Sequence, residues 1–231
     1  MSFNVEGKLY DFIQTKRGLG YSYNGYPVYD VTRFDIKKLG SLADKYGIPL
    51  EWFANLINHE TAGTFNPAIT NSIGATGLIQ FLSSTAQNLG TSTSALREMS
   101  FSEQLEWVDK YLFKNFDYLN VFENKEDAKS GKNYKVKNTF NQGDLFMTIF
   151  YPASVGKDFE TYTFPSSVPA NNSGIYKPKD YVDKALRNAP FPNADYFLPK
   201  VGSFATFWWL IPLALFGGTL TYLYFRQKLK K

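Results

Sequence analysis

Cysteine is missing from the 231-residue sequence, and histidine occurs only once, as His59. Without cysteine the chain has no disulfide framework, no thiol nucleophile and no thiolate ligand for a metal. A single imidazole excludes zinc sites built from several histidines and argues against a serine triad, which would depend on His59 alone. These absences direct attention to carboxyl groups, and we expect neither a metal nor a cofactor.

An excess of charge of one sign is also missing from most of the chain. The net charge of +4 results from 25 Lys and Arg against 21 Asp and Glu. The surplus lies in the basic tail at residues 226–231, which holds Arg226, Lys228, Lys230 and Lys231, so residues 1–200 carry no net charge. Because the body has no basic excess by count, we expect no nucleic-acid partner.

The segment from Val201 to Phe225 lacks charge altogether over 25 residues. At about 1.5 Å per residue, a helix of this length crosses a hydrocarbon core of roughly 30 Å. Trp208 and Trp209 lie near one end and Tyr222 and Tyr224 near the other, as is typical of two membrane interfaces. The pattern predicts a transmembrane helix at 201–225, with lipid as a partner.

The orientation of this predicted anchor remains open. No apolar signal-peptide core occurs before residue 30, so we expect a single-pass protein that is anchored at its C-terminus. The basic residues 226–231 favour the cytoplasmic side, which would place the body on the opposite side without a segment to export it. The two indications conflict, and a host inner membrane and the internal membrane of a virus particle are both candidates.

The remaining pattern predicts a mainly α-helical protein. Residues 1–34 are rich in Tyr and Gly and are expected to be irregular, with at most a short strand. A body at 35–190 precedes a Pro-rich tether at 191–200. Its expected helices begin at capping or proline signals and are separated by long loops. They lie at 35–46, with Asp35 as the cap and Gly47 as the stop, at 49–60, from 83, from 100 behind a capping box of Ser100 and Glu103, at 144–151 with Asp144 as the cap, and at 178–188.

Glu60 is the most informative residue of the body. Leu50, Phe53, Ala54 and Ile57 follow helical spacing, and Glu60 continues their apolar stripe. A carboxyl group on that stripe loses hydration, which raises its pKa and lets it hold a proton near neutrality. The alternative is a buried glutamate that an Arg or backbone groups satisfy.

The residues after Glu60 favour the catalytic interpretation. Glu60-Thr61-Ala62-Gly63-Thr64-Phe65-Asn66-Pro67 leads to Gly74-Ala75-Thr76-Gly77-Leu78-Ile79-Gln80 and then to Ser84-Thr85-Ala86. This string resembles the SLT-type lytic transglycosylases, a goose-type lysozyme-like group that cleaves peptidoglycan. Thr61 replaces the family's Ser and Ile79 its Met, while Phe150-Tyr151-Pro152-Ala153 resembles a phage-type variant of the Tyr-Asn-Ala-Gly segment.

The resemblance covers residues 35–190 and implies a lysozyme-like catalytic domain. Glu60 would protonate the bond between N-acetylmuramic acid and N-acetylglucosamine, and then act as a base to give a 1,6-anhydro product. The resemblance further implies that Thr61, Gly77, Ile79, Gln80 and Tyr151 bind the glycan strand. Tyr151 would also hold Glu60, whereas His59 is expected to point away from the cleft.

The sequence is consistent with three functions. The first is a phage virion-associated lytic transglycosylase that opens the cell wall, with peptidoglycan and other virion proteins as partners. The second is a lysozyme-type hydrolase that adds water to the same bond. The third is a catalytically silent structural membrane protein of the virion. The mass of the released disaccharides would distinguish the first function from the second, because an anhydro end lacks the mass of one water.

Overall fold

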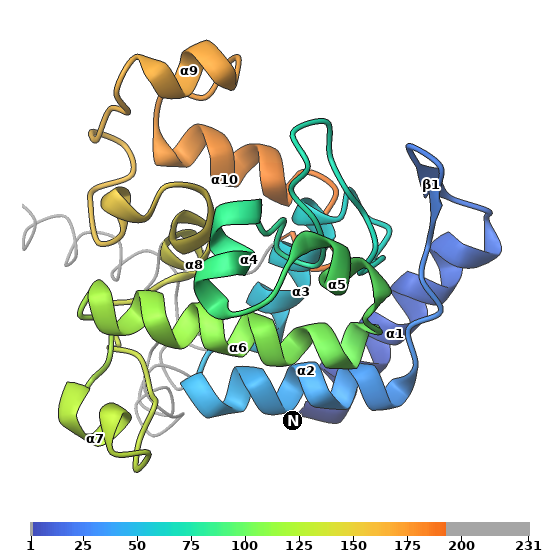
Figure 1. Cartoon of the computed structure of the whole chain (residues 1–231), viewed down its shortest axis with the longest axis horizontal. Coiled ribbons are helices and arrows are strands. Elements are labelled where there is room, and N and C mark those ends of the chain that lie inside the picture. Colours follow the sequence, from blue (N-terminus) through green and yellow to red (C-terminus); the bar gives the residue numbers. More distant parts are fainter. Residues whose placement is uncertain (1, 193–231) are drawn as a thin grey trace, which may run out of the picture. The chain divides into compact units, whose positions relative to one another are not determined.

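The computed structural model describes residues 2–192 of the chain (Figure 1). Within them the protein is mainly helical, as predicted, with one hairpin of two short strands. The elements are α1 (Ser2–Gly18), β1 (Ser22–Tyr23), β2 (Tyr26–Pro27), α2 (Arg33–Tyr46), α3 (Leu50–Glu60), α4 (Ser83–Leu89), α5 (Thr93–Glu98), α6 (Phe101–Tyr118), α7 (Lys125–Lys129), α8 (Gln142–Phe150), the 3₁₀ turn η1 (Pro152–Ser154), α9 (Ser167–Asn171) and α10 (Pro178–Leu186).

The predicted membrane segment at 201–225, the basic tail at 226–231 and most of the tether lie outside the described residues. Within residues 2–192, no helix has both the length and the apolar character needed to cross a bilayer. The membrane helix therefore stays a prediction from sequence.

The N-terminal segment differs from its expected irregular form. Residues 2–18 form helix α1, which packs against α2 and α3. Leu9 and Ile13 are four residues apart, so they share one face of the helix, and each is only 1% exposed. The Tyr- and Gly-rich residues lie after this helix. There β1 pairs with β2, which agrees with the expectation of short strand structure.

Helix α2 begins one turn earlier than the capping signal at Asp35 suggested. Thr32 is the N-cap, and its hydroxyl accepts from the backbone N–H of Asp35, whose carboxylate accepts from the backbone of Thr32 in return. Asp35 is thus the third helical residue of a capping box rather than the cap. Gly47 ends the helix in the left-handed conformation, as the sequence predicted.

The same arrangement recurs at α8, where Asp144 was the expected cap. Asn141 is the N-cap and Asp144 the third residue of the capping box. The capping box at Ser100 and Glu103 opens α6 as predicted. In both helices the acidic residue takes part in capping, but as the third helical residue of the capping box. The N-cap itself lies three positions earlier and is a Thr or an Asn, whose side-chain oxygens also cap helices.

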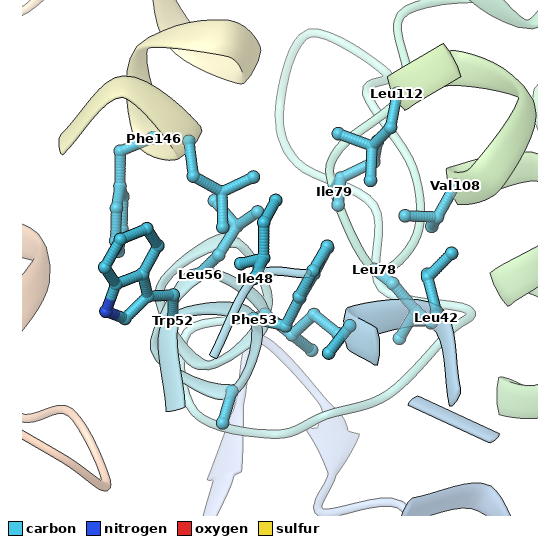
Figure 2. Packing of buried hydrophobic residues seen from close by; sticks show 14 of the residues in the cluster. Leu42, Ile48, Trp52, Phe53, Leu56, Leu78, Ile79, Val108, Leu112 and Phe146 are labelled. Atoms are coloured by element: carbon cyan, nitrogen blue, oxygen red, sulfur yellow. The ribbon is translucent and has the colours of Figure 1, made fainter. Parts of the chain in front are cut away.

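Helix α3 lies at the centre of the body and contacts α1, α2, α8 and α10. Its residues Phe53, Leu56 and Ile57 are fully buried. Figure 2 shows Trp52, Phe53 and Leu56 within the hydrophobic cluster. A helix packed on several sides is held rigidly, so the position of its last residue, Glu60, is fixed by the core.

Candidate active site

Glu60 is the last residue of α3 and is partly buried. Tyr181 of α10 donates a hydrogen bond from its hydroxyl to Oε1 of Glu60, with an O···O distance of 2.9 Å. Among the described residues, no ion pair involves Glu60. Within the described residues, Glu60 is therefore not neutralised by an Arg, which was the alternative interpretation.

The environment of Glu60 shifts its proton affinity. Burial raises the pKa of Glu60 to about 7, and the hydrogen bond from Tyr181 opposes that rise in part. Burial acts in this direction because it penalises the charged carboxylate. The carboxyl group is thus protonated in a large fraction of molecules near neutral pH, which confirms the pKa direction expected from the apolar stripe.

Aromatic rings hold Tyr181 in place beside Glu60. The ring of Phe150 stacks on that of Tyr181 with 4.0 Å between centroids, and the His59 ring meets it edge-on at 5.0 Å. Burial, and then the charge of Glu60, raises the pKa of Tyr181 well above its usual value. Tyr181 therefore stays a hydroxyl donor throughout the neutral range.

Tyr111 is a second tyrosine under the influence of Glu60. Burial raises the pKa of Tyr111 to about 12, with a smaller contribution from the charge of Glu60. Its hydroxyl donates to the backbone oxygen of Thr148 at 3.0 Å. Tyr111 thereby ties α6 to α8 while keeping its ring near the carboxyl group.

Tyr181 takes the role that the sequence assigned to Tyr151. Tyr151 ends α8, is partly buried and packs its ring edge-on against Phe164 at 5.1 Å. The expectation that its hydroxyl holds Glu60 is corrected, since the hydrogen bond comes from Tyr181. The Tyr151 segment still contributes, because the neighbouring Phe150 stacks on Tyr181. Tyr181 was missed because it sits on the apolar face of its helix like an ordinary core residue.

Three of the expected substrate-binding residues are buried inside the loop at 61–82. The hydroxyl of Thr61 donates to the backbone oxygen of Ile57 at 2.6 Å and accepts from the N–H of Phe65 at 3.0 Å. Ile79 is 2% exposed and lies in the core with Val108 and Leu112 (Figure 2). Gly77 is also buried. These residues shape the loop, and their contact with a glycan stays a prediction from the resemblance.

Gln104 organises this loop and was not recognised as a site residue. It is fully buried, accepts from the N–H of Leu78 at 2.9 Å and donates to the backbone oxygens of Pro67 and Leu96 at 2.6 and 2.7 Å. A Cβ on Gly77, which has φ +91°, would approach Oε1 of Gln104 to 2.5 Å. Both its backbone conformation and the closeness of Gln104 thus require glycine at position 77.

Gln80 remains available to a ligand through one atom. Its backbone has φ +53°, a strained conformation for a residue other than glycine. Its Nε2 donates to the backbone oxygen of Gly77 at 3.0 Å, and the side chain is partly exposed. Within residues 2–192, Oε1 of Gln80 accepts no hydrogen bond, so this oxygen can accept one from a bound molecule.

His59 lines a pocket whose lining residues do not include Glu60. This agrees with the expectation that His59 points away from the site. Burial, with a smaller contribution from Lys184, lowers the pKa of His59 to about 4. The imidazole is therefore neutral near pH 7, and its contact with Tyr181 is a packing contact.

Comparison with known families supports the resemblance over part of the chain. Residues 39–105 match the family model described as Transglycosylase SLT domain. No curated protein and no solved structure matches the chain. The match includes Glu60, Gln80 and Gln104 but ends before Tyr151 and Tyr181, so the hydroxyl that contacts Glu60 comes from outside the matched segment.

Proposed function

We propose that this protein is a peptidoglycan lytic transglycosylase in which Glu60 is the only catalytic carboxyl group. The observation that carries the proposal is the pKa of Glu60, raised to about 7 within the segment that matches the SLT domain model. A group that holds and releases its proton near neutrality can act as a general acid and as a general base in one cycle.

The proposed reaction uses both protonation states of Glu60. Protonated Glu60 donates its proton to the oxygen between N-acetylmuramic acid and N-acetylglucosamine, and the bond breaks as positive charge develops at the anomeric carbon. The 2-acetamido oxygen of the substrate stabilises that charge. Glu60, now a carboxylate, takes the proton of the C6 hydroxyl while this oxygen bonds to the anomeric carbon, giving the 1,6-anhydro product.

Two surrounding residues support this cycle. Tyr181 donates to Oε1 of Glu60, and this bond strengthens when the carboxylate forms, since charge-assisted hydrogen bonds are stronger than neutral ones. Oε1 of Gln80 is proposed to accept from the acetamido N–H of the sugar. Tyr151 remains a proposed contact for the glycan, now without a role in holding Glu60.

Digestion of purified peptidoglycan by the detergent-solubilised chain tests the proposal. The wild type should release disaccharides with anhydro ends, and Glu60→Gln should reduce their release by at least about a hundredfold. Glu98→Gln, at an exposed position, is a matched control for the same loss of charge. Products heavier by one water would establish the hydrolase instead, and a wild type that releases nothing would favour the silent virion protein.

We further propose that the enzyme is a membrane-anchored component of a phage particle that acts during cell-wall penetration. Support comes from the uncharged run at 201–225 and from the phage-type segment at Tyr151. Leu215→Arg, in the middle of this run, should release the protein from isolated membranes under alkaline extraction, because a charge at the bilayer centre is costly. Retention of this variant would contradict the anchor, and absence of the protein from purified particles would contradict the virion assignment.

A further inference from the structure

The pocket that His59 lines has a volume of about 230 Å³ and lies beside the end of α3, and Glu60 is not among its lining residues. Its lining includes Lys16 of α1, Tyr21 next to β1, Asn58 and His59 of α3, and Lys184 of α10. The pocket thus joins the N-terminal helix, which lies outside the segment matched by the family model, to the helix that bears Glu60. A pocket of this size admits a group smaller than a typical drug-sized ligand.

The charge of this pocket is unbalanced. Lys16 and Lys184 both line it, and its lining within the described residues contains no Asp or Glu. The Lys16 ammonium lies 4.4 Å from the ring centroid of Tyr21 and 5.3 Å from that of Phe12, so aromatic faces rather than a carboxylate hold it. Burial also lowers the pKa of Lys16. A partly buried cation without a counter-ion favours the binding of an anion.

The pocket also contains a hydrogen-bond acceptor without a donor. Asn58 is 5% exposed, and its Nδ2 donates to the backbone oxygen of Asn188 at 3.2 Å. Its Oδ1 is buried and has no hydrogen-bond partner. Leaving a buried acceptor unpaired is unfavourable, and a ligand N–H would relieve that cost.

Glycine at position 63 keeps the two groups accessible to each other. A Cβ at Gly63 would collide with Nζ of Lys16 and lie 3.5 Å from Oδ1 of Asn58. The cation and the empty acceptor therefore face the same small space. A ligand that uses both needs a negative group and a nearby N–H donor, which is the combination that a peptide carboxylate offers.

We propose that this pocket binds a carboxylate group of a short acidic peptide. The inference rests on the proposed function for the source of that peptide, because peptidoglycan strands carry short acidic peptides close to the bond that is cleaved. Asn58 and His59 directly precede Glu60 on α3, so the pocket lies near the proposed catalytic residue although Glu60 does not line it. The site would favour glycan that still bears its peptides.

Direct binding tests the proposal without any cleavage. The probe is N-acetyl-L-alanyl-D-glutamate, titrated by calorimetry into the full chain with Glu60→Gln, and the neutral diamide of the probe is the control ligand. Lys16→Met and Lys184→Met should each weaken binding about tenfold, as expected for the loss of a charged hydrogen bond. Lys8→Met, on an exposed position of α1, should leave binding unchanged. Lys184→Arg, which keeps the charge, should retain most of the affinity.

Each result separates this proposal from the proposed function. The peptide site would be overturned if the acid and the diamide bound equally, or if neither bound. It would also be overturned if Lys8→Met lost as much affinity as the variants of the pocket lysines. None of these results would affect the proposal that Glu60 digests peptidoglycan. Binding of inorganic sulfate as tight as that of the peptide would also overturn it, because sulfate carries no proton to donate to Oδ1 of Asn58. Peptide binding by a wild type that fails to digest peptidoglycan would instead support the pocket and refute the enzyme.

Discussion

The hydroxyl of Tyr181 and the carboxyl group of Glu60 form a hydrogen bond across 121 positions of the sequence. Glu60 lies within the segment that matches the SLT domain model, and Tyr181 lies 76 residues beyond its end at residue 105. The proton affinity of the proposed catalytic group thus depends on α10. A fragment of residues 39–105 alone would lack the hydrogen bond that lowers the pKa of Glu60.

Replacing Tyr181 by Phe should raise the pKa of Glu60, because the Tyr181 hydrogen bond stabilises the carboxylate. Digestion requires protonated Glu60 and should decline in the wild type as pH rises through about 7. Tyr181→Phe should move this decline to higher pH and lower kcat about tenfold, since the carboxylate formed during the reaction loses a donor. Turbidity assays across pH measure both effects.

Tyr151→Phe is the control for this prediction, since the ring contact with Phe164 is kept and the hydroxyl does not hold Glu60. Its pH profile should follow that of the wild type. If Tyr151→Phe moved the decline and Tyr181→Phe did not, the assignment of the two tyrosines would be reversed.

The raised pKa of Glu60 also predicts that this residue destabilises the protein at alkaline pH. The value is 4.5 for an unperturbed Glu and about 7 in the fold, so the folded state binds the proton more tightly. Stability therefore falls as pH rises from 4.5 to 7, by on the order of 3 kcal/mol from this group. Glu60→Gln should be more stable than the wild type at pH 8 by up to that amount and similar to it at pH 4.5.

Urea unfolding at the two pH values, followed by tryptophan fluorescence, measures this difference. Glu98→Gln should show no comparable gain, because Glu98 is exposed. A Glu60→Gln variant that is less stable than the wild type at pH 8 would mean that the carboxylate is well solvated, and the proposed acid role would lose its basis.

The apolar stripe of α3 was sufficient to predict the inward position of Glu60 and the direction of its pKa shift. The partner of Glu60 was not predictable in the same way, because Tyr181 comes from a helix whose placement depends on long-range packing against α3 and α8. The local motif likewise identified Gly77 as a site residue, but it did not explain why this position needs glycine. Besides its positive φ, Gly77 leaves room for Gln104, which is 27 residues away in sequence and buried.

His59 gives the opposite pH dependence of stability. Its pKa is 6.5 when unperturbed and about 4 in the fold, so the folded state disfavours the imidazolium. The stabilisation from neutral His59 is present above pH 6.5 and is lost as pH falls toward 4, by on the order of 3 kcal/mol. His59→Phe keeps a ring against Tyr181 and should resist acid unfolding better than the wild type between pH 6.5 and 4.

The comparison of His59→Phe with the wild type isolates this group, because Glu60 titrates in both proteins. Lys184→Met should give a smaller effect in the same direction, since Lys184 is the lesser cause of the shift. Equal acid sensitivity of wild type and His59→Phe would show that the imidazole is solvated when the protein is folded.

Two glycines of one loop allow backbone strain to be separated from a steric clash. Gly74 and Gly77 have φ +82° and +91°, so alanine is strained at either position. A Cβ on Gly74 meets nothing within 4 Å, whereas one on Gly77 would meet Oε1 of Gln104 at 2.5 Å. Gly74→Ala should therefore cost about 1–2 kcal/mol of unfolding free energy, from strain alone.

Gly77→Ala should cost at least about 2 kcal/mol more than Gly74→Ala, because Gln104 must move and release the N–H of Leu78 and the oxygens of Pro67 and Leu96. Chemical unfolding of both variants measures the difference, and digestion assays show whether the displaced loop also weakens Gln80. Equal destabilisation by the two substitutions would mean that Gln104 adapts freely. Gly77 would then be required only for its backbone conformation, and the role of Gln104 in ordering the loop would be refuted.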